Sequence, residues 1–245
     1  GVAQRLMMAF FLALLVVAVV LYKTSGTAIF SAFGIGLAFW LMLGALTDLS
    51  LKAGFGKAPV SVMLRRLAGL PKSVFGTAFA HFGLGVTLLG IVVVSTFATE
   101  DVTVMKQGQT VRVADYTLRF DRIDPVKDSN FTEDQGKFTI LDSAAREVDT
   151  MMSSKRFYPV RKMQTTEAGI KTFLFSQLYV SLGDATPDGG MVVRVWWKPY
   201  VTLIWLGALV MMAGGAMSLA DRRLRVGAPG KAKAAKPQRA RGAMA

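Results

Sequence analysis

The sequence predicts an α-helical transmembrane protein with four spans and a β-rich domain inserted between the third and fourth spans. Hydrophobic residues make up 52% of the 245 residues and charged residues only 18%, whereas a soluble domain usually carries about a quarter charged residues. Four apolar stretches reach the roughly 20 residues that a helix needs to cross a bilayer. The stretch 98–199 instead shows the alternating hydrophobicity of strands.

The first three predicted spans lie within residues 1–97, and the fourth follows the inserted domain. They are expected at about 6–22, 27–47, 76–97 and 200–220. Only a short turn beginning at Lys23 separates the first two, so these form a hairpin. A secretory signal peptide is the alternative for the first span. It is the weaker interpretation, because the apolar run is long for such a segment and no small-residue cleavage site follows it.

The basic residues predict the orientation, because cationic loops stay on the cytoplasmic side of a membrane. The predicted loop 48–75 carries five basic residues, and the tail 221–245 carries eight against the single acid Asp221. Both are expected in the cytoplasm, and with them both chain termini. The domain 98–199 then lies outside. The tail from Val226 on lacks apolar residues to pack and is expected to be disordered.

The inserted domain is electrically neutral, with 14 basic and 14 acidic residues, so the net charge of +13 belongs to the rest of the chain. Such a charge usually suggests a nucleic-acid partner, but here it flanks the spans and predicts orientation and contact with anionic lipid headgroups. Alternation predicts strands at 116–123 and 138–141 and a longer strand at 173–182. The turn formers of 183–190 predict a β-hairpin.

Two residue counts exclude several classes of site. The chain has no cysteine, so zinc fingers, Fe–S clusters and cysteine nucleophiles are excluded. It has one histidine, His81, so a site with several histidines cannot form within this chain. No phosphate-binding glycine loop or other catalytic motif stands out.

His81 is the candidate site residue, because an ionisable side chain inside a span is costly and usually functional. One interpretation is a neutral histidine that bonds a Ser, a Thr or a backbone carbonyl of a neighbouring helix. The other is an axial haem ligand, since neutral imidazole binds iron well. Gly83 and Gly85 would let either a porphyrin or another helix come close.

Other candidates have plain structural explanations. Asp48 is expected at the membrane interface rather than in a proton relay, and the aromatic cluster Trp196–Tyr200 in an interfacial belt rather than a ligand platform. Gly214 and Gly215 permit close helix packing. The basic pairs beginning at Lys155 and Arg161 form a solvated face, with an acidic partner or haem propionates as the alternative.

Several longer runs resemble the C-terminal end of the CcmF family, the large membrane subunit of the haem lyase in bacterial System I cytochrome c biogenesis. They are Tyr179–Gly190, Val195–Pro199, Ile204–Gly207 and Gly214–Arg223, with Lys155–Tyr158, Thr165–Ala168 and Ala80–Gly83 matching further upstream. The resemblance covers essentially the whole chain.

This resemblance implies a cytochrome c haem lyase subunit in the bacterial inner membrane, with 98–199 periplasmic. Members of the family take haem from the chaperone CcmE and attach it to apocytochrome c, together with CcmH and, in some organisms, CcmI. They also hold a haem b between two transmembrane histidines, which is thought to reduce the incoming haem. His81 matches the second of these, so the resemblance implies that it is the cofactor and metal ligand of this chain.

The sequence also departs from the family pattern. The tryptophan-rich haem-binding motif, its flanking histidines and the other transmembrane histidine have no counterpart here, and the chain begins at Gly1 without Met. We therefore expect a C-terminal fragment or one half of a split protein, which needs the remaining N-terminal part of CcmF and is inactive alone. The alternative is a non-catalytic membrane scaffold or docking subunit of a periplasmic assembly complex.

Overall fold

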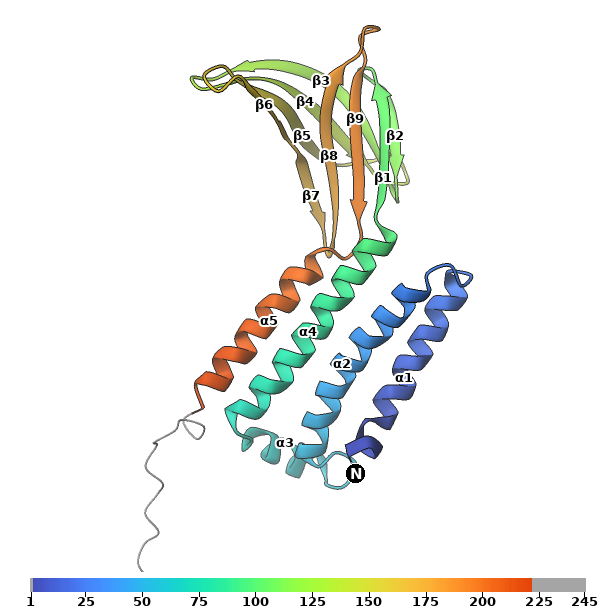
Figure 1. The fold of residues 1–245 in the computed structure, drawn as a ribbon, viewed down its shortest axis with the longest axis vertical. Coiled ribbons are helices and arrows are strands. Elements are labelled where there is room, and N and C mark those ends of the chain that lie inside the picture. Colours follow the sequence, from blue (N-terminus) through green and yellow to red (C-terminus); the bar gives the residue numbers. More distant parts are fainter. Residues whose placement is uncertain (1, 222–245) are drawn as a thin grey trace, which may run out of the picture.

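The structure is a computed structural model that describes residues 2–221, with a bundle of helices at one end and a β domain at the other (Figure 1). The helices are α1 (Val2–Lys23), α2 (Ile29–Ala53), α3 (Val60–Ala68), α4 (Lys72–Phe97) and α5 (Thr202–Leu219). All except the short α3 are long and apolar enough to cross a membrane. The prediction of four spans and an inserted β-rich domain is confirmed.

The four long helices form a row in which α1 contacts α2, α2 contacts α4, and α4 contacts α5. The closest of these helix contacts occur at glycines, which have no side chain to keep the backbones apart. On α4, Gly76, Gly83 and Gly90 recur every seven residues and so share one face. This face meets Gly207 and Gly214 of α5. A Cβ atom at Gly83 would lie 2.6 Å from the carbonyl oxygen of Gly207, so the two backbones touch directly.

Helix boundaries on the side away from the β domain differ from the prediction, and the predicted loop 48–75 is largely helical. Helix α2 runs past 47 to Ala53, where Gly54 ends it in a left-handed conformation with φ +88°. Pro59 and Pro71 then precede α3 and α4, since a fixed φ near −58° suits a helix start. Hydropathy alone missed these ends because it follows apolar content, whereas glycine and proline decide where a helix stops and starts.

The described part of the β domain has nine strands in two antiparallel sheets, ordered β1-β9-β8-β7 and β2-β3-β4-β5-β6. The strands are β1 (Thr99–Met105), β2 (Thr110–Val113), β3 (Tyr116–Lys127), β4 (Thr132–Leu141), β5 (Glu147–Tyr158), β6 (Met163–Glu167), β7 (Gly169–Phe173), β8 (Ser176–Ala185) and β9 (Met191–Lys198). Helix α4 leads into β1, and β9 leads into α5. These two strands pair directly, with Thr99 opposite Trp197. The domain is therefore inserted through two neighbouring strands.

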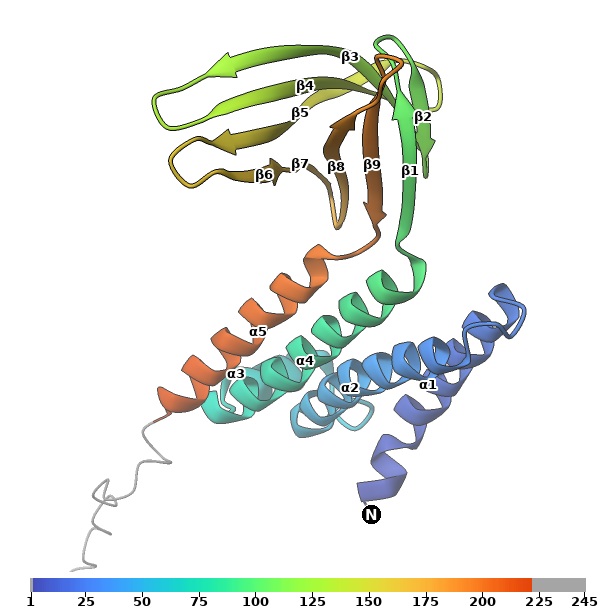
Figure 2. The ribbon, with the colours of Figure 1, turned by 45° about the horizontal axis from the view of Figure 1, so that its top comes forward.

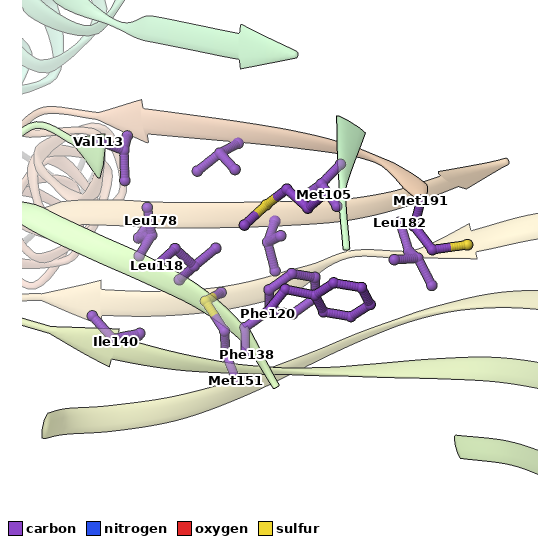
Figure 3. Close-up of a cluster of buried hydrophobic side chains, with 13 residues drawn as sticks. Met105, Val113, Leu118, Phe120, Phe138, Ile140, Met151, Leu178, Leu182 and Met191 are labelled. Atoms are coloured by element: carbon purple, nitrogen blue, oxygen red, sulfur yellow. The ribbon is translucent and has the colours of Figure 1, made fainter. Parts of the chain in front are cut away.

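A single apolar core fills the space between the two sheets (Figure 3). Its centre is the pair Phe120 and Phe138, which face each other across β3 and β4 with ring centroids 5.0 Å apart. Leu118 and Ile140 form the next pair on the same face. This alternation along the strands confirms the β-rich interpretation of the sequence.

The predicted hairpin is confirmed, and the predicted long strand at 173–182 is confirmed from Ser176 on, whereas its predicted start is wrong. Strand β8 pairs with β9, and the turn at 186–190 closes with a hydrogen bond from the N–H of Thr186 to the carbonyl of Gly190. The long strand is two strands, because Leu174 takes φ +53° and the chain reverses there. The reason is tertiary: the hydroxyl of Thr202, at the start of α5, donates to the carbonyl of Phe175 at 2.9 Å. The predicted disordered tail falls outside the described residues, apart from Asp221.

Candidate functional site

His81 lies on α4 at the wall of an open pocket between α1, α2 and α4. The pocket has a volume of about 390 Å³. Helix α2 supplies most of its lining, from Trp40 through Gly44 to Asp48 and Leu51, a spacing of four or three residues that keeps these positions on one helix face. The pocket therefore lies between His81, the only histidine of the sequence, and one face of α2.

The His81 ring has a defined proton arrangement. Its Nδ1 atom lies 2.9 Å from the carbonyl oxygen of Thr77, one turn earlier on the same helix. Because a carbonyl can only accept, Nδ1 carries a proton, and in the neutral form of the ring the lone pair is then on Nε2. Among the described residues no hydrogen bond is made by Nε2. Metal-binding histidines commonly show this pattern, with one nitrogen on a carbonyl and the other on the metal.

The pocket has both apolar and polar lining residues. Leu6, Trp40 and Leu41 contribute apolar side chains, and Thr47, Asp48 and Thr77 contribute polar ones. The carboxylate of Asp48 pairs with the ammonium group of Lys52 at 2.6 Å, one turn along α2. Asp48 therefore has an ion-pair partner beside the pocket.

These residues fit haem better than a free metal ion. Among the described residues no group of three or more His, Cys, Asp or Glu side chains could hold a metal ion. A haem iron needs only axial ligands from the protein, because the porphyrin supplies the other four nitrogens. One imidazole with a free Nε2 beside apolar walls meets that requirement for one axial position.

Two glycines beside His81 serve helix packing instead of porphyrin contact. A Cβ atom at Gly83 would meet α5, and one at Gly85 would lie 2.6 Å from the side chain of Met42 on α2. Gly214 likewise packs on α4, whereas Gly215 has open space around it. Of the two interpretations of Gly83 and Gly85, the structure supports the approach of another helix.

The Trp196–Tyr200 cluster is divided between two environments. Trp197 points into the base of the β domain, where its ring lies 5.6 Å from Tyr116 and 6.2 Å from Phe173. Tyr200 is exposed at the junction with α5. Trp197 is thus partly buried and packs against the core of the domain, and the interfacial belt stays a prediction.

The first of the two basic pairs is neutralised within the β domain. Lys155 pairs with Asp184, and Arg156 donates from Nε to the carboxylate of Glu133 at 2.6 Å. Ser154 donates to the same carboxylate oxygen at 2.6 Å. Burial raises the pKa of Glu133, but the hydrogen bonds from Ser154 and Arg156 and the charge of Arg156 outweigh burial and hold the pKa below its ordinary value.

The second basic pair lies in the turn between β5 and β6. Arg161 and Lys162 are both exposed there, on the β domain and apart from the pocket of His81. The structure therefore does not bring either basic pair together with His81.

Sequence reasoning missed the association of His81 with Trp40 and Asp48. A signal for it existed, because Trp40, Gly44 and Asp48 recur every four residues and therefore share a helix face. The partner face on α4 could not be assigned, since the helix neighbours follow from glycine contacts in three dimensions.

Comparisons with known proteins agree on one family. The family model described as "CcmF C-terminal beta-sandwich" matches residues 96–199. The "Cytochrome c-type biogenesis protein CycK" of Rhizobium meliloti (strain 1021) is 56% identical over 235 residues, which are 96% of this chain and 35% of that protein. The "Cytochrome c-type biogenesis protein CcmF" of Pseudomonas fluorescens is 34% identical over 214 residues, 87% of this chain and 31% of that protein.

A solved structure titled "Cytochrome c Heme Lyase CcmF" shares the fold. Its TM-score is 0.60 at 14% sequence identity, and the match covers 89% of this chain and 34% of that one. The chain thus spans about a third of the length of the relatives that it matches.

Proposed function

The chain belongs to the CcmF family and corresponds to its C-terminal region, and from this premise we propose that it forms part of a membrane haem lyase. In this proposal the complete lyase receives haem from the chaperone CcmE and attaches it covalently to apocytochrome c. CcmH, and CcmI where present, complete the complex. The reacting thiols belong to apocytochrome c, so a chain without cysteine is compatible with this role.

Within that lyase we assign His81 the role of an axial ligand to a haem b. The observation that carries this proposal is the bond from Nδ1 to the carbonyl of Thr77, which leaves Nε2 free beside an apolar pocket. The carbonyl fixes both the tautomer and the ring orientation. When bound, a haem b supplies single electrons that keep the incoming haem ferrous.

The other residues of the pocket support the same role. Leu6, Trp40 and Leu41 give the pocket of His81 apolar walls, and the carboxylate of Asp48 in the same pocket is neutralised by Lys52. His81 is the single histidine of the sequence, so the second axial ligand comes from the remaining part of the lyase.

We further propose that the β domain is periplasmic and that both chain termini lie in the cytoplasm, in a multi-pass protein of the inner membrane. The basic residues between α2 and α4 support this orientation. They gather at the end of the bundle opposite the β domain, where Arg65, Arg66 and Lys72 lie on or next to α3 (Figure 1).

The ligand role is tested with the purified full-length protein and its His81→Ala variant. We expect the b-type band in reduced-minus-oxidised spectra to be lost or strongly reduced in His81→Ala. The matched control is Thr77→Ala, which keeps the backbone carbonyl that accepts from Nδ1 and should keep the band. An unchanged band in His81→Ala would overturn the role of His81.

A non-catalytic scaffold or docking subunit is the competing proposal, and one surface favours it. The outer face of the sheet β1-β9-β8-β7 exposes Val102, Val104 and Ile170 to solvent. The same spectra decide between the two proposals, because a native complex without any b-type haem would favour the scaffold.

A further inference from the structure

Helix α3 joins α2 to α4 at the end of the bundle opposite the β domain (Figures 1 and 2). It contacts mainly α2 and buries none of its residues. A helix that buries nothing gains little from packing, and a nine-residue helix is marginal in water by itself. Its stability therefore requires a surface that the described chain does not provide.

The sequence of α3 divides it into two unlike faces. Val60, Met63, Leu64 and Leu67 follow the spacing that places side chains on one face. Val60 is 69% exposed and Leu64 is 61% exposed. Ser61, Arg65 and Arg66 occupy the opposite face. The helix thus presents an uncovered apolar face backed by positive charge.

The flanking spans set the depth of this helix relative to a bilayer. At 1.5 Å per residue, α2 with 25 residues and α4 with 26 are each roughly 38 Å long. The hydrocarbon core is about 30 Å thick, so the ends of these spans extend into the headgroup region. Because α3 connects two such ends, it lies at the level of the headgroups, where amphipathic helices bind.

The charged residues of α3 and of the two loops that flank it are all basic. Arg66 extends over the end of α2, since a Cβ atom at Gly54 would lie 2.5 Å from its Nη1 atom. A cation is favourable at a helix C-terminus. Lys57, Arg65 and Lys72 are exposed and make no ion pair with any described residue. They remain available for anionic groups outside the chain.

We propose that α3 lies in the membrane interface with Val60 and Leu64 inserted among acyl chains, while Lys57, Arg65 and Lys72 bind the headgroups of anionic phospholipids. Two observations select a lipid surface as the partner. Helix α3 connects the ends of two spans that are long and apolar enough to cross a membrane, and its nearby cations match the negative charge of the cytoplasmic leaflet, on which the orientation proposed above places them. This proposal does not depend on haem binding.

The depth of α3 is measurable because the chain contains no cysteine. The variants Leu64→Cys and Ser61→Cys each accept one environment-sensitive fluorophore, on the apolar and the polar face respectively. The full-length protein is placed in vesicles of equimolar phosphatidylglycerol and phosphatidylcholine. We expect brominated acyl chains to quench the label at 64 several-fold more than the label at 61, and aqueous iodide to show the reverse order.

Each other outcome of the quenching experiment overturns the proposal. If iodide reaches both labels equally, α3 lies in water. If neither bromine nor iodide reaches the label at 64, another protein covers the apolar face.

Headgroup binding needs a separate measurement. Native mass spectrometry of the full-length protein, purified from the same vesicles, counts the phosphatidylglycerol molecules that remain bound. We expect Arg65→Gln to retain fewer of them, and the matched control Lys127→Gln, an exposed unpaired lysine at the end of β3, to retain as many as the unmodified protein. Equal retention in both variants overturns the assignment of anionic headgroups to this site.

Discussion

The carboxylate of Asp221 accepts a hydrogen bond of 3.0 Å from the backbone N–H of Ser73 and so joins the end of α5 to the first turn of α4. Helix α4 begins after Pro71, whose side chain has no oxygen to bond the free N–H groups of the first turn. Asp221 is 6% exposed and supplies that oxygen from a residue distant in sequence. Its negative charge also suits the positive end of the α4 dipole.

Replacement of Asp221 should therefore loosen the end of the bundle opposite the β domain. We expect Asp221→Ala to lower the free energy of unfolding by about 1 kcal/mol, the usual effect of a lost helix cap. Thermal unfolding in detergent, followed by circular dichroism, measures it. Asp115→Ala, in the exposed turn between β2 and β3, is the control and should leave Tm unchanged. Equal Tm values for both variants would remove Asp221 from this role.

The contact between α4 and α5 leaves no room for a methyl group at Gly83. A Cβ atom there would meet backbone atoms of α5, which cannot rotate away. We expect Gly83→Ala to destabilise the bundle by about 1–3 kcal/mol, the range for overpacked sites. Gly215→Ala adds the same methyl group in open space on α5 and should be harmless. A melting experiment that ranks the two variants in the opposite order would contradict this account.

Acid should destabilise the β domain partly through Glu133. Its pKa in the folded protein lies below the ordinary value, because hydrogen bonds and charge outweigh burial. Its stabilisation is therefore complete above the ordinary pKa of glutamate and is lost as the pH falls through the lower folded value. In acid titrations of unfolding, Glu133→Gln should be less sensitive to pH in that range. Glu100 is exposed and forms no ion pair with another described residue, so Glu100→Gln should keep the full dependence of the unfolding free energy on pH.

The turn between β7 and β8 offers a test of backbone strain. Leu174 is 84% exposed and holds a left-handed φ of +53°, which costs a non-glycine residue about 1–2 kcal/mol. Glycine removes that strain, but it also raises the conformational entropy of the unfolded chain, which costs about 0.5–1 kcal/mol of stability. Leu174→Gly should therefore raise the free energy of unfolding by on the order of 0.5 kcal/mol. Val160→Gly, at an exposed residue without a positive φ, should lose stability. Denaturant unfolding distinguishes the two signs.

The sequence predicted the parts of this molecule that depend on local pattern. Long apolar runs predicted the four spans, and alternation predicted the strands that carry Phe120 and Phe138 within a β-rich domain. The hairpin before β9 followed from its turn formers. In each case the determining residues are neighbours in the chain, so their pattern is visible before folding.

The remaining features depend on contacts between distant residues. The turn at Leu174 has no glycine or proline to mark it, and α5 helps to hold it through Thr202. Helix α3 was missed because its nine residues are too short for a span and lie in a strongly basic stretch. The pocket beside His81 needed the order of the helices, which follows from close contacts at Gly83 and Gly85.

The paired junctions of the β domain have a mechanical consequence. Strands β1 and β9 are hydrogen-bonded neighbours, and the helices that continue them touch backbone to backbone. Helices α4 and α5 therefore form one unit, in which neither helix slides without the other. Helix α4 also carries His81, so the imidazole and the β domain are connected through this one pair of helices and strands.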